Sequence, residues 1–236
     1  MSASPATSRI CVALDMPDAE RAAALAQKLV GHADMLKVGM ELFYGAGAEG
    51  YEVIAAAGLP VFLDLKLHDI PNTVARALDA LLNALEPAPA ILNVHAFGGP
   101  AMLKAAAEAV AGRAKLIAVT VLTSLSAEDL AHIGHAHAPR DTVLRLAALA
   151  KECGLDGVVC SPQEVAAIRA ALGDDFLTIV PGIRPAGAAM NDQQRAATPA
   201  RAQAAGADIL VIGRPVTQAE DPVKALKSIR AELVAS

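Results

Sequence analysis

Tryptophan is absent from this sequence, and aromatic residues occupy only 3% of its 236 positions. A surface that stacks nucleic-acid bases needs several aromatic rings, so the chain cannot offer such a platform. The net charge is −5, whereas nucleic-acid interfaces gather lysine and arginine into basic patches. The composition therefore argues against a nucleic acid as the partner of this protein.

Cysteine is scarce, and its spacing is unlike that of a metal site or a disulfide framework. The three cysteines, Cys11, Cys153 and Cys160, are odd in number and lie in or near apolar segments. Cysteines of this kind are typical of reduced, buried thiols. We therefore expect a cytoplasmic protein.

Segments that would direct the chain to a membrane are missing as well. Residues 1–8 are small and polar, which predicts a disordered N-terminal tail and not a signal peptide. The longest stretch without Asp, Glu, Lys or Arg, residues 87–103, contains three prolines and a glycine pair. Such a stretch does not span a membrane, and no membrane association is expected.

What the sequence does contain is an alternation of short apolar strands and helices, repeated eight times. Strands are expected at residues 10–14, 35–38, 61–65, 91–94, 116–121, 157–160, 177–180 and 208–212. A helix with a serine cap is expected to start at Ser161, and a last helix runs over 222–234. The pattern predicts an α/β protein, a single-domain (β/α)8 TIM barrel over residues 9–236; a doubly wound open sheet is the alternative.

One of these strands carries charges on a face that should be buried. Asp64 and Lys66 are two residues apart and so share one face of the strand, while leucines occupy the other face. Asp69 follows where the strand ends. Because opposite charges are costly to bury, the stretch is either a structural ion pair at a barrel rim or part of a reactive site.

Polar residues at the carboxyl ends of the other strands should face the same side of a barrel. They are Asp15, Lys37, Asn93, His95, Thr123, Arg184 and Arg214. The last two each lie between a glycine and a proline on neighbouring loops, where backbone N–H groups and guanidinium donors can hold a phosphate. We expect an anion site there in preference to two solvated surface arginines.

A long segment, residues 183–198, contains the first of these arginines and is rich in alanine, with one glycine and one asparagine. Long loops on a rigid barrel are often lids, although a flexible surface loop is the plainer interpretation. Three histidines lie in another spacer, residues 126–140: His132, His135 and His137. They lack a carboxylate third ligand with convincing spacing, so a solvated loop is expected there and not a metal site. His68 and His95 are expected to be hydrogen-bonded structural histidines.

Three stretches of this sequence carry a resemblance to a known family. They are Asp-Leu-Lys-Leu-His-Asp-Ile-Pro-Asn-Thr at 64–73, Pro-Gly-Ile-Arg-Pro at 181–185 and Ile-Gly-Arg-Pro at 212–215. Together they resemble the bacterial orotidine 5′-phosphate decarboxylases, with Asp15 and Lys37 at the expected strand ends. The Asp-x-Lys-x-x-Asp core alone marks a wider superfamily, whereas its combination with Ile-Pro-Asn-Thr and the two arginine loops is highly specific.

The resemblance implies cofactor-free decarboxylation of orotidine 5′-monophosphate to uridine 5′-monophosphate in de novo pyrimidine biosynthesis. It implies that the catalytic residues are Lys66, Asp64, Asp69 and Lys37, with Lys66 stabilising and protonating a carbanion at C6. The implied substrate-binding residues are Asp15, Lys37, Ile70, Thr73, Thr123, Arg184, Gln193, Gly213 and Arg214. Gln193 is preferred to Gln194 because its distance from Arg184 fits the family pattern.

The resemblance also implies a homodimer, in which Asp69, Ile70 and Thr73 reach the neighbouring subunit's site. Two other functions remain open. Mg²⁺-dependent sugar-phosphate decarboxylases and aldolases share the same core, and Glu41 could supply the extra acidic ligand that they need near the second strand. A non-catalytic barrel that binds a phosphoribosyl ligand is the other alternative.

Overall fold

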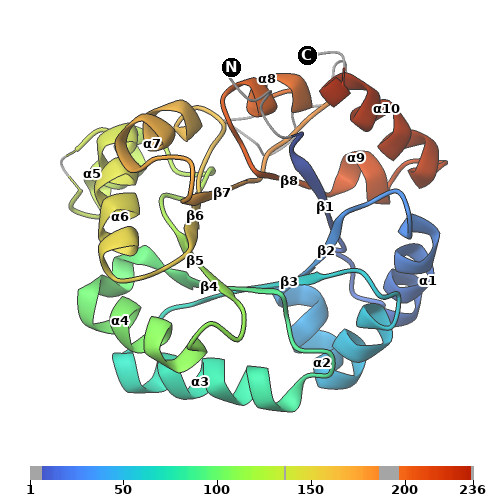
Figure 1. Cartoon of the computed structure of the whole chain (residues 1–236), viewed down its shortest axis with the longest axis horizontal. Coiled ribbons are helices and arrows are strands. Elements are labelled where there is room, and N and C mark those ends of the chain that lie inside the picture. Colours follow the sequence, from blue (N-terminus) through green and yellow to red (C-terminus); the bar gives the residue numbers. More distant parts are fainter. Residues whose placement is uncertain (1–6, 136, 186–196, 235–236) are drawn as a thin grey trace.

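The computed structural model describes residues 7–135, 137–185 and 197–234. Within them, parallel strands close into a barrel in which each strand pairs with its neighbours in the chain and β8 returns to β1. Figure 1 looks down this ring. The strands are β1 (Arg9–Ala13), β2 (Met35–Gly39), β3 (Val61–Leu67), β4 (Ile91–His95), β5 (Lys115–Val119), β6 (Gly157–Val159), β7 (Leu177–Val180) and β8 (Ile209–Ile212). The barrel prediction is confirmed, and the open sheet is excluded.

The helices form a ring outside the strands (Figure 1). They are α1 (Ala19–Leu29), α2 (Met40–Ala55), α3 (Pro71–Ala84), α4 (Gly99–Val110), α5 (Ala127–His132), α6 (Pro139–Glu152), α7 (Val165–Leu172), α8 (Pro199–Ala204), α9 (Arg214–Thr217) and α10 (Pro222–Val234), with a 3-10 turn, η1, at Ala96–Gly98. Among the helices in the described ranges, none has both the length and the apolar character needed to cross a bilayer.

Local signals in the sequence account for several helix starts. The carboxylate of Asp18 accepts the N–H of Arg21 at 3.0 Å and so caps α1. Pro71 and Pro222 are the first residues of α3 and α10, where a missing N–H costs nothing. The bounds of α10, Pro222–Val234, are those expected from the sequence.

Two local expectations were wrong. The helix expected from Ser161 begins at Val165, because Ser161 and Glu164 first close a turn: the carboxylate of Glu164 accepts the N–H of Ser161 at 2.9 Å. The spacer 126–140, expected to be a loop, contains α5. A reciprocal cap between Ser126 and Asp129 starts this helix, and that four-residue signal was readable in the sequence.

The start of the packed chain also differs by one residue from the expected boundary. Ser8 is buried, its Oγ donates to the carbonyl of Ala207 at 2.6 Å, and its N–H donates to the side chain of Gln203. Packing therefore begins at Ser8, whereas the sequence placed the end of the tail there. Residues 1–6 lie outside the described part of the chain.

Side chains fill both faces of the strands. One apolar cluster lies between the barrel and its helices, and a smaller cluster fills the barrel interior: Cys11, Ala13, Met35, Phe62, Ile91, Ile117, Ile179, Ile209 and Val211. Because strand side chains alternate, the residue two positions after each inward residue also faces inward. The residues two positions after Met35, Phe62 and Ile91 are polar: Lys37, Asp64 and Asn93. The fold therefore places a polar set above an apolar filling.

Candidate active site

Four alternating charges lie in a row across the carboxyl ends of β1, β2 and β3, which are neighbours in Figure 1. The Nζ of Lys37 lies 2.8 Å from Oδ1 of Asp15 and 3.2 Å from Oδ2 of Asp64. The Nζ of Lys66 lies 2.7 Å from Oδ1 of Asp64. Each oxygen of Asp64 thus faces a different lysine, and the strand-end positions predicted from the sequence do come together.

A glycine makes room for this row. A Cβ atom at Gly39 would lie 2.8 Å from Oδ1 of Asp15 and 2.9 Å from Nζ of Lys37, closer than side chains pack. Gly39 ends β2 directly beside the pair. The close approach of Asp15 and Lys37 therefore requires that this position carry no side chain.

Burial and opposite charge act against each other on the two central groups. Burial alone would lower the pKa of Lys37, but Asp64 and Asp15 outweigh it and hold that pKa above its ordinary value of 10.5. Burial would likewise raise the pKa of Asp64, but Lys37 and Lys66 hold it below 3.8. Both groups therefore stay charged at neutral pH, each because the other is present.

The strand that carries Lys66 is irregular at this residue. In the ladder between β3 and β4, Leu63 pairs with Leu92, and the next pair is Leu67 with Val94. The chain therefore moves four residues along β3 but only two along β4, which is a β-bulge. Within this bulge Lys66 has a φ of 52°, in the left-handed region that side chains other than glycine rarely adopt. Such a backbone is strained and persists only when its surroundings hold it.

Simple alternation is the reason that the sequence offers for Asp64 and Lys66 sharing a face. The two side chains do meet, and Leu63 and Leu65 do lie in the outer cluster. However, the backbone reaches this contact through the bulge and the left-handed residue, not through a regular pleat. The contact was predicted correctly, but the stated geometric reason was incomplete.

Asn93 on β4 joins the row, although no role was expected for it from the sequence. Its side chain is 1% exposed and follows the inward Ile91 by two positions. Its Nδ2 donates to Oδ1 of Asp64 at 2.7 Å, and its Oδ1 accepts the backbone N–H of Lys66 at 2.7 Å. A buried amide at an inward strand position was the available signal, since buried polar groups must find partners.

Two cavities open on the charged row. One, of about 450 Å³, is mainly polar and is lined by Asp15, Lys37, Asp64, Lys66, Gly182, Arg184, Gly213 and Arg214 among others. The other, of about 170 Å³, is mainly apolar; besides Thr123, its lining includes Val119, Val121, Leu122, Val159 and Ile179. Lys37, Asp64 and Lys66 line both. The row therefore stands at the boundary between a polar and an apolar compartment.

The two arginines that the sequence assigned to an anion site both line the polar cavity. Arg184 is buried, and its backbone N–H donates to the carbonyl of Ala197 at 2.9 Å. Arg214 is the first residue of α9 and directly follows Gly213. A Cβ atom at Gly213 would lie 3.6 Å from Cβ of Ala13 and 4.0 Å from Oδ2 of Asp15. Gln193 and residues 186–196 of the expected lid lie outside the described residues.

Three predicted site residues are not part of the row in a single chain. Asp69, Ile70 and Thr73 are exposed where β3 leads into α3, and Ile70 is 65% exposed despite its apolar side chain. The carboxylate of Asp69 accepts the N–H of Ile70. Within residues 7–135, 137–185 and 197–234, no ion pair joins Asp69 to Lys66.

Aromatic stacking holds the histidines near this site. The ring of His95 lies 5.3 Å from that of His68 and 5.5 Å from that of Phe97. Burial, followed by the charges of His68 and Lys66, lowers the pKa of His95 to about 4. Its Nδ1 has no hydrogen-bond partner among the described residues, so the hydrogen bond expected from the sequence is not made at this nitrogen. The ring of His135 lies 4.7 Å from Phe97.

The described part of the chain contains no group of three or more His, Cys, Asp and Glu side chains that could hold a metal ion. The ammonium of Lys37 lies between the carboxylates of Asp15 and Asp64. Glu41, the extra acidic ligand considered above, is exposed on the first turn of α2. A cation is thus already present where two carboxylates would bridge a metal.

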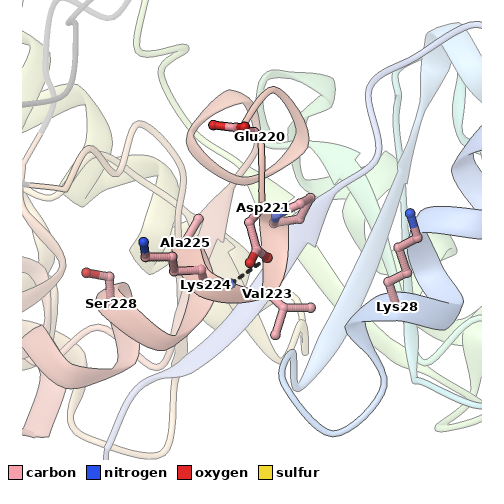
Figure 2. Close-up of a pocket in the computed structure, with 8 residues that line it drawn as sticks. Lys28, Glu220, Asp221, Val223, Lys224, Ala225 and Ser228 are labelled. Carbon is pink, nitrogen blue, oxygen red and sulfur yellow. Dashed lines mark hydrogen bonds between the residues drawn. The ribbon is translucent and has the colours of Figure 1, made fainter.

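Another hollow lies away from these residues. Figure 2 shows this open space of about 960 Å³, with Lys28 of α1 on one side and the start of α10 on the other. The carboxylate of Asp221 accepts the N–H of Lys224 at 3.0 Å, which caps α10. None of the residues predicted to act in catalysis or binding lines this space. Its polar groups are those of an ordinary helix start.

Comparison with known proteins gives a consistent result across nearly the whole chain. The family model for the "Orotidine 5'-phosphate decarboxylase / HUMPS family" matches residues 8–229. A protein of Halorhodospira halophila named orotidine 5′-phosphate decarboxylase is 56% identical over 235 residues, which is 98% of each chain. One of the same name from Nitrosococcus oceani is 54% identical over 229 residues, 96% of this chain and 97% of the relative.

A solved structure agrees with these sequence matches. The crystal structure of orotidine 5′-phosphate decarboxylase from Lactobacillus acidophilus superposes with a TM-score of 0.80 at 38% identity, covering 96% of this chain and 99% of the other. The likeness therefore includes the complete barrel.

Proposed function

The chain belongs to the orotidine 5′-phosphate decarboxylase / HUMPS family, and we propose that it decarboxylates orotidine 5′-monophosphate to uridine 5′-monophosphate. The observation that carries this proposal is the row Asp15–Lys37–Asp64–Lys66, which places one lysine beside a buried carboxylate at the mouth of the barrel. The product makes the reaction a step of pyrimidine biosynthesis. The relatives named above support this substrate.

The chemistry needs charges placed in advance. Loss of CO2 from C6 leaves an sp2 carbanion that no ring carbonyl delocalises directly, so the protein must stabilise it electrostatically. We assign this to the ammonium of Lys66, which then delivers its proton to C6. Asp64 would stand beside the substrate carboxylate and disfavour it relative to the transition state, in which that charge departs as CO2.

The size of this effect can be bounded. Two unit charges ~4 Å apart interact by about 4 kcal/mol at an effective dielectric of 20, which corresponds to about three decades in rate. Rate enhancements by enzymes are larger than this, so other interactions must add to it. Binding energy from the remote phosphate is the available source, because such energy can be spent at the reacting carbon.

We assign the phosphate to the polar cavity. Arg184, Gly213 and Arg214 line it, and guanidinium groups with nearby glycine backbone match a phosphate in charge and geometry. Gln193 is assigned to the same anion from the sequence resemblance alone. Asp15 stands at one end of the row and also lines this cavity. Together with Lys37 it would bind the ribose.

The apolar cavity would receive the reacting end of the pyrimidine. Thr123 lines it and would contact the ring, while the other walls include Val119, Val159 and Ile179. A carboxylate loses its hydration against such walls, whereas neutral CO2 does not. The apolar walls therefore favour the departure of CO2, in the same direction as Asp64.

We further propose that the active form is a homodimer in which each chain completes the other's site. Asp69 and Ile70 are exposed on the β3–α3 connection, and Thr73 is exposed on the first turn of α3, where a second copy could cover them. Ile70 is 65% exposed, and contact with a second copy would remove this apolar side chain from water. Asp69 would then extend the row of charges into the neighbouring chain. A cytoplasmic location is proposed as well, in keeping with three free, buried cysteines.

The Mg²⁺-dependent alternative is less well supported. It needs a cation between carboxylates, and Lys37 already lies between Asp15 and Asp64. Glu41, the further acidic ligand that it needs, is exposed on the first turn of α2, and no ion pair or hydrogen bond among the described residues joins it to the row. The residues of the row therefore suit a reaction in which lysine, not a metal, supplies the positive charge.

The proposed function is tested by the fall in ultraviolet absorbance that follows loss of conjugation when orotidine 5′-monophosphate is added to protein treated with EDTA. We expect turnover that EDTA does not reduce, and none with Lys66→Ala, although Lys66→Ala should still bind uridine 5′-monophosphate. Lys104→Ala, which changes an exposed lysine on α4, is the control and should be fully active. No turnover of orotidine 5′-monophosphate, together with Mg²⁺-dependent turnover of a sugar phosphate, would favour the alternative.

A further inference from the structure

We propose that Asn93 is a positioning residue of this site: it fixes the carboxylate of Asp64 and the backbone of Lys66 with one side chain. The role in turnover rests on the proposed function, whereas the role in geometry does not. Nothing in the sequence resemblance assigns Asn93 a part. The structure assigns it through two hydrogen bonds, one to each of the residues proposed to act on C6.

The first part of the argument is the bulge in β3. Between the pairs Leu63–Leu92 and Leu67–Val94 the regular ladder is interrupted. The side chain of Asn93 accepts the N–H of Lys66 at 2.7 Å at this point, in place of a backbone carbonyl of β4. Since a left-handed residue with an unpaired buried N–H would be doubly costly, this bond stabilises the strained backbone that carries the lysine.

The second part is the orientation of Asp64. Its Oδ1 accepts from Nδ2 of Asn93 and from Nζ of Lys66, both at 2.7 Å, and its Oδ2 faces Lys37 at 3.2 Å. Asp64 could keep its charge with two lysines alone, but lysine side chains are flexible and their ammonium groups are not directional. The buried amide is a directional donor, so it fixes the plane in which the carboxylate of Asp64 lies between the two lysines.

The polarity of the amide is set by its partners. A backbone N–H can only donate and an ionised carboxylate can only accept, so Oδ1 must face Lys66 and Nδ2 must face Asp64. Aspartate at position 93 would satisfy both partners only when protonated, because its O–H would then replace the amide donor. When ionised it would face Asp64 as a like charge. Leucine, of similar size, would satisfy neither partner at any pH.

These differences define the experiment. Asn93→Asp and Asn93→Leu are compared with the native chain, with Thr120→Val as the matched control. Thr120 is also buried at the end of a strand, and its Oγ1 donates to the carbonyl of Val159 at 2.8 Å outside the charged row. Steady-state kinetics with orotidine 5′-monophosphate are measured from pH 5 to 8, and exchange of the Lys66 amide with deuterium is followed by NMR without substrate.

We expect Asn93→Leu to lower kcat by about 100-fold or more while KM changes little, since a small misplacement of a reacting group has such an effect. This deficit should be the same at every pH. In Asn93→Asp the deficit should shrink as pH falls from 8 to 5, because the carboxyl then gains its proton. The Lys66 amide should exchange about tenfold faster or more in Asn93→Leu. Thr120→Val should change none of these.

A rise in KM as large as the fall in kcat in Asn93→Leu would overturn the proposal. So would a deficit in Asn93→Asp that does not shrink at low pH. An unchanged rate of exchange at the Lys66 amide in Asn93→Leu would overturn it as well. If Asn93→Leu does not fold, Asn93→Asp alone decides through its pH profile and its amide exchange. If the native chain has no decarboxylase activity, the proposed function fails, and amide exchange at Lys66 still tests whether Asn93 holds this backbone.

Discussion

Lys66 places its Nζ 2.7 Å from Oδ1 of Asp64 from a backbone whose φ is 52°. The ion pair and the left-handed residue are thus parts of one arrangement. A non-glycine residue in this region costs of order 1–3 kcal/mol. The strand is therefore not in its most stable form where the proposed chemistry takes place, and the neighbouring side chains hold it there.

This strain predicts a difference between two inactive variants. Lys66→Gly and Lys66→Ala lose the same ion pair, but glycine adopts a positive φ without steric cost. We expect Lys66→Gly to be more stable than Lys66→Ala by about 1 kcal/mol, although glycine usually destabilises a strand. Urea unfolding midpoints measure the difference. Equal midpoints would mean that the backbone at Lys66 relaxes when the side chain is removed.

Sharing of sites across the dimer predicts that two inactive chains restore activity together. A hybrid of Lys66→Ala and Asp69→Ala would carry one intact site, because Lys66 comes from one chain and Asp69 from the other. Random pairing of equal amounts should give about one quarter of native activity. Lys66→Ala mixed with Asp64→Ala is the control, since these residues touch within one chain and every hybrid site would lack one of them. No recovery after verified subunit exchange would argue against sharing.

The anion site predicts a selective effect on substrate binding. Arg214→Ala should raise KM by at least about tenfold, because a charge-assisted contact to phosphate is worth about 1.5–3 kcal/mol. Orotidine without its phosphate should be turned over equally poorly by the native chain and the variant. Arg201→Ala, which changes an exposed arginine on α8, should leave KM unchanged. An unchanged KM in Arg214→Ala would place the phosphate elsewhere.

The depressed pKa of His95 predicts how stability changes with pH. Its pKa is about 4 in the folded protein, and its ordinary value is 6.5. Between these values the unfolded chain binds a proton that the folded chain does not, so this contribution to stability is full above pH 6.5 and is lost as pH falls toward 4. His95→Phe keeps a ring in the stack with His68 and Phe97 but cannot titrate.

The measurement is the free energy of unfolding between pH 4 and 7, from urea titrations at each pH. Stability of His95→Phe should fall less steeply with decreasing pH than that of the native chain. Identical slopes would show that His95 does not remain neutral in the folded state.

The parts of this structure that the sequence predicts are those fixed by local pattern. Period-two alternation within a strand and the repeated strand–helix order were sufficient for the barrel. Asp15, Lys37 and Asp64 come together because each ends an inward-facing run on adjacent strands, which the barrel brings side by side. Their meeting follows from topology once the barrel is accepted.

The parts that the sequence did not predict depend on contacts between distant segments. The bulge at Lys66 arises from the pairing of β3 with β4, and neither strand shows it alone. The role of Asn93 requires knowing which backbone N–H that pairing leaves open. The role proposed for Asp69 requires a second chain, whose position the structure of one chain does not give. The helix α5 is different, because its Ser126–Asp129 cap was visible in the sequence.

The apolar filling of the barrel has a consequence for proton supply. Beneath the charged row the interior is occupied by side chains such as Met35, Phe62, Ile91 and Ile117, which carry no proton and admit no chain of water. In the proposed reaction, a lysine that has given its proton to the product would therefore be reloaded through the mouth of the barrel. Reprotonation of the lysine and release of the product would then use the same opening, so we expect them to occur one after the other within each catalytic cycle.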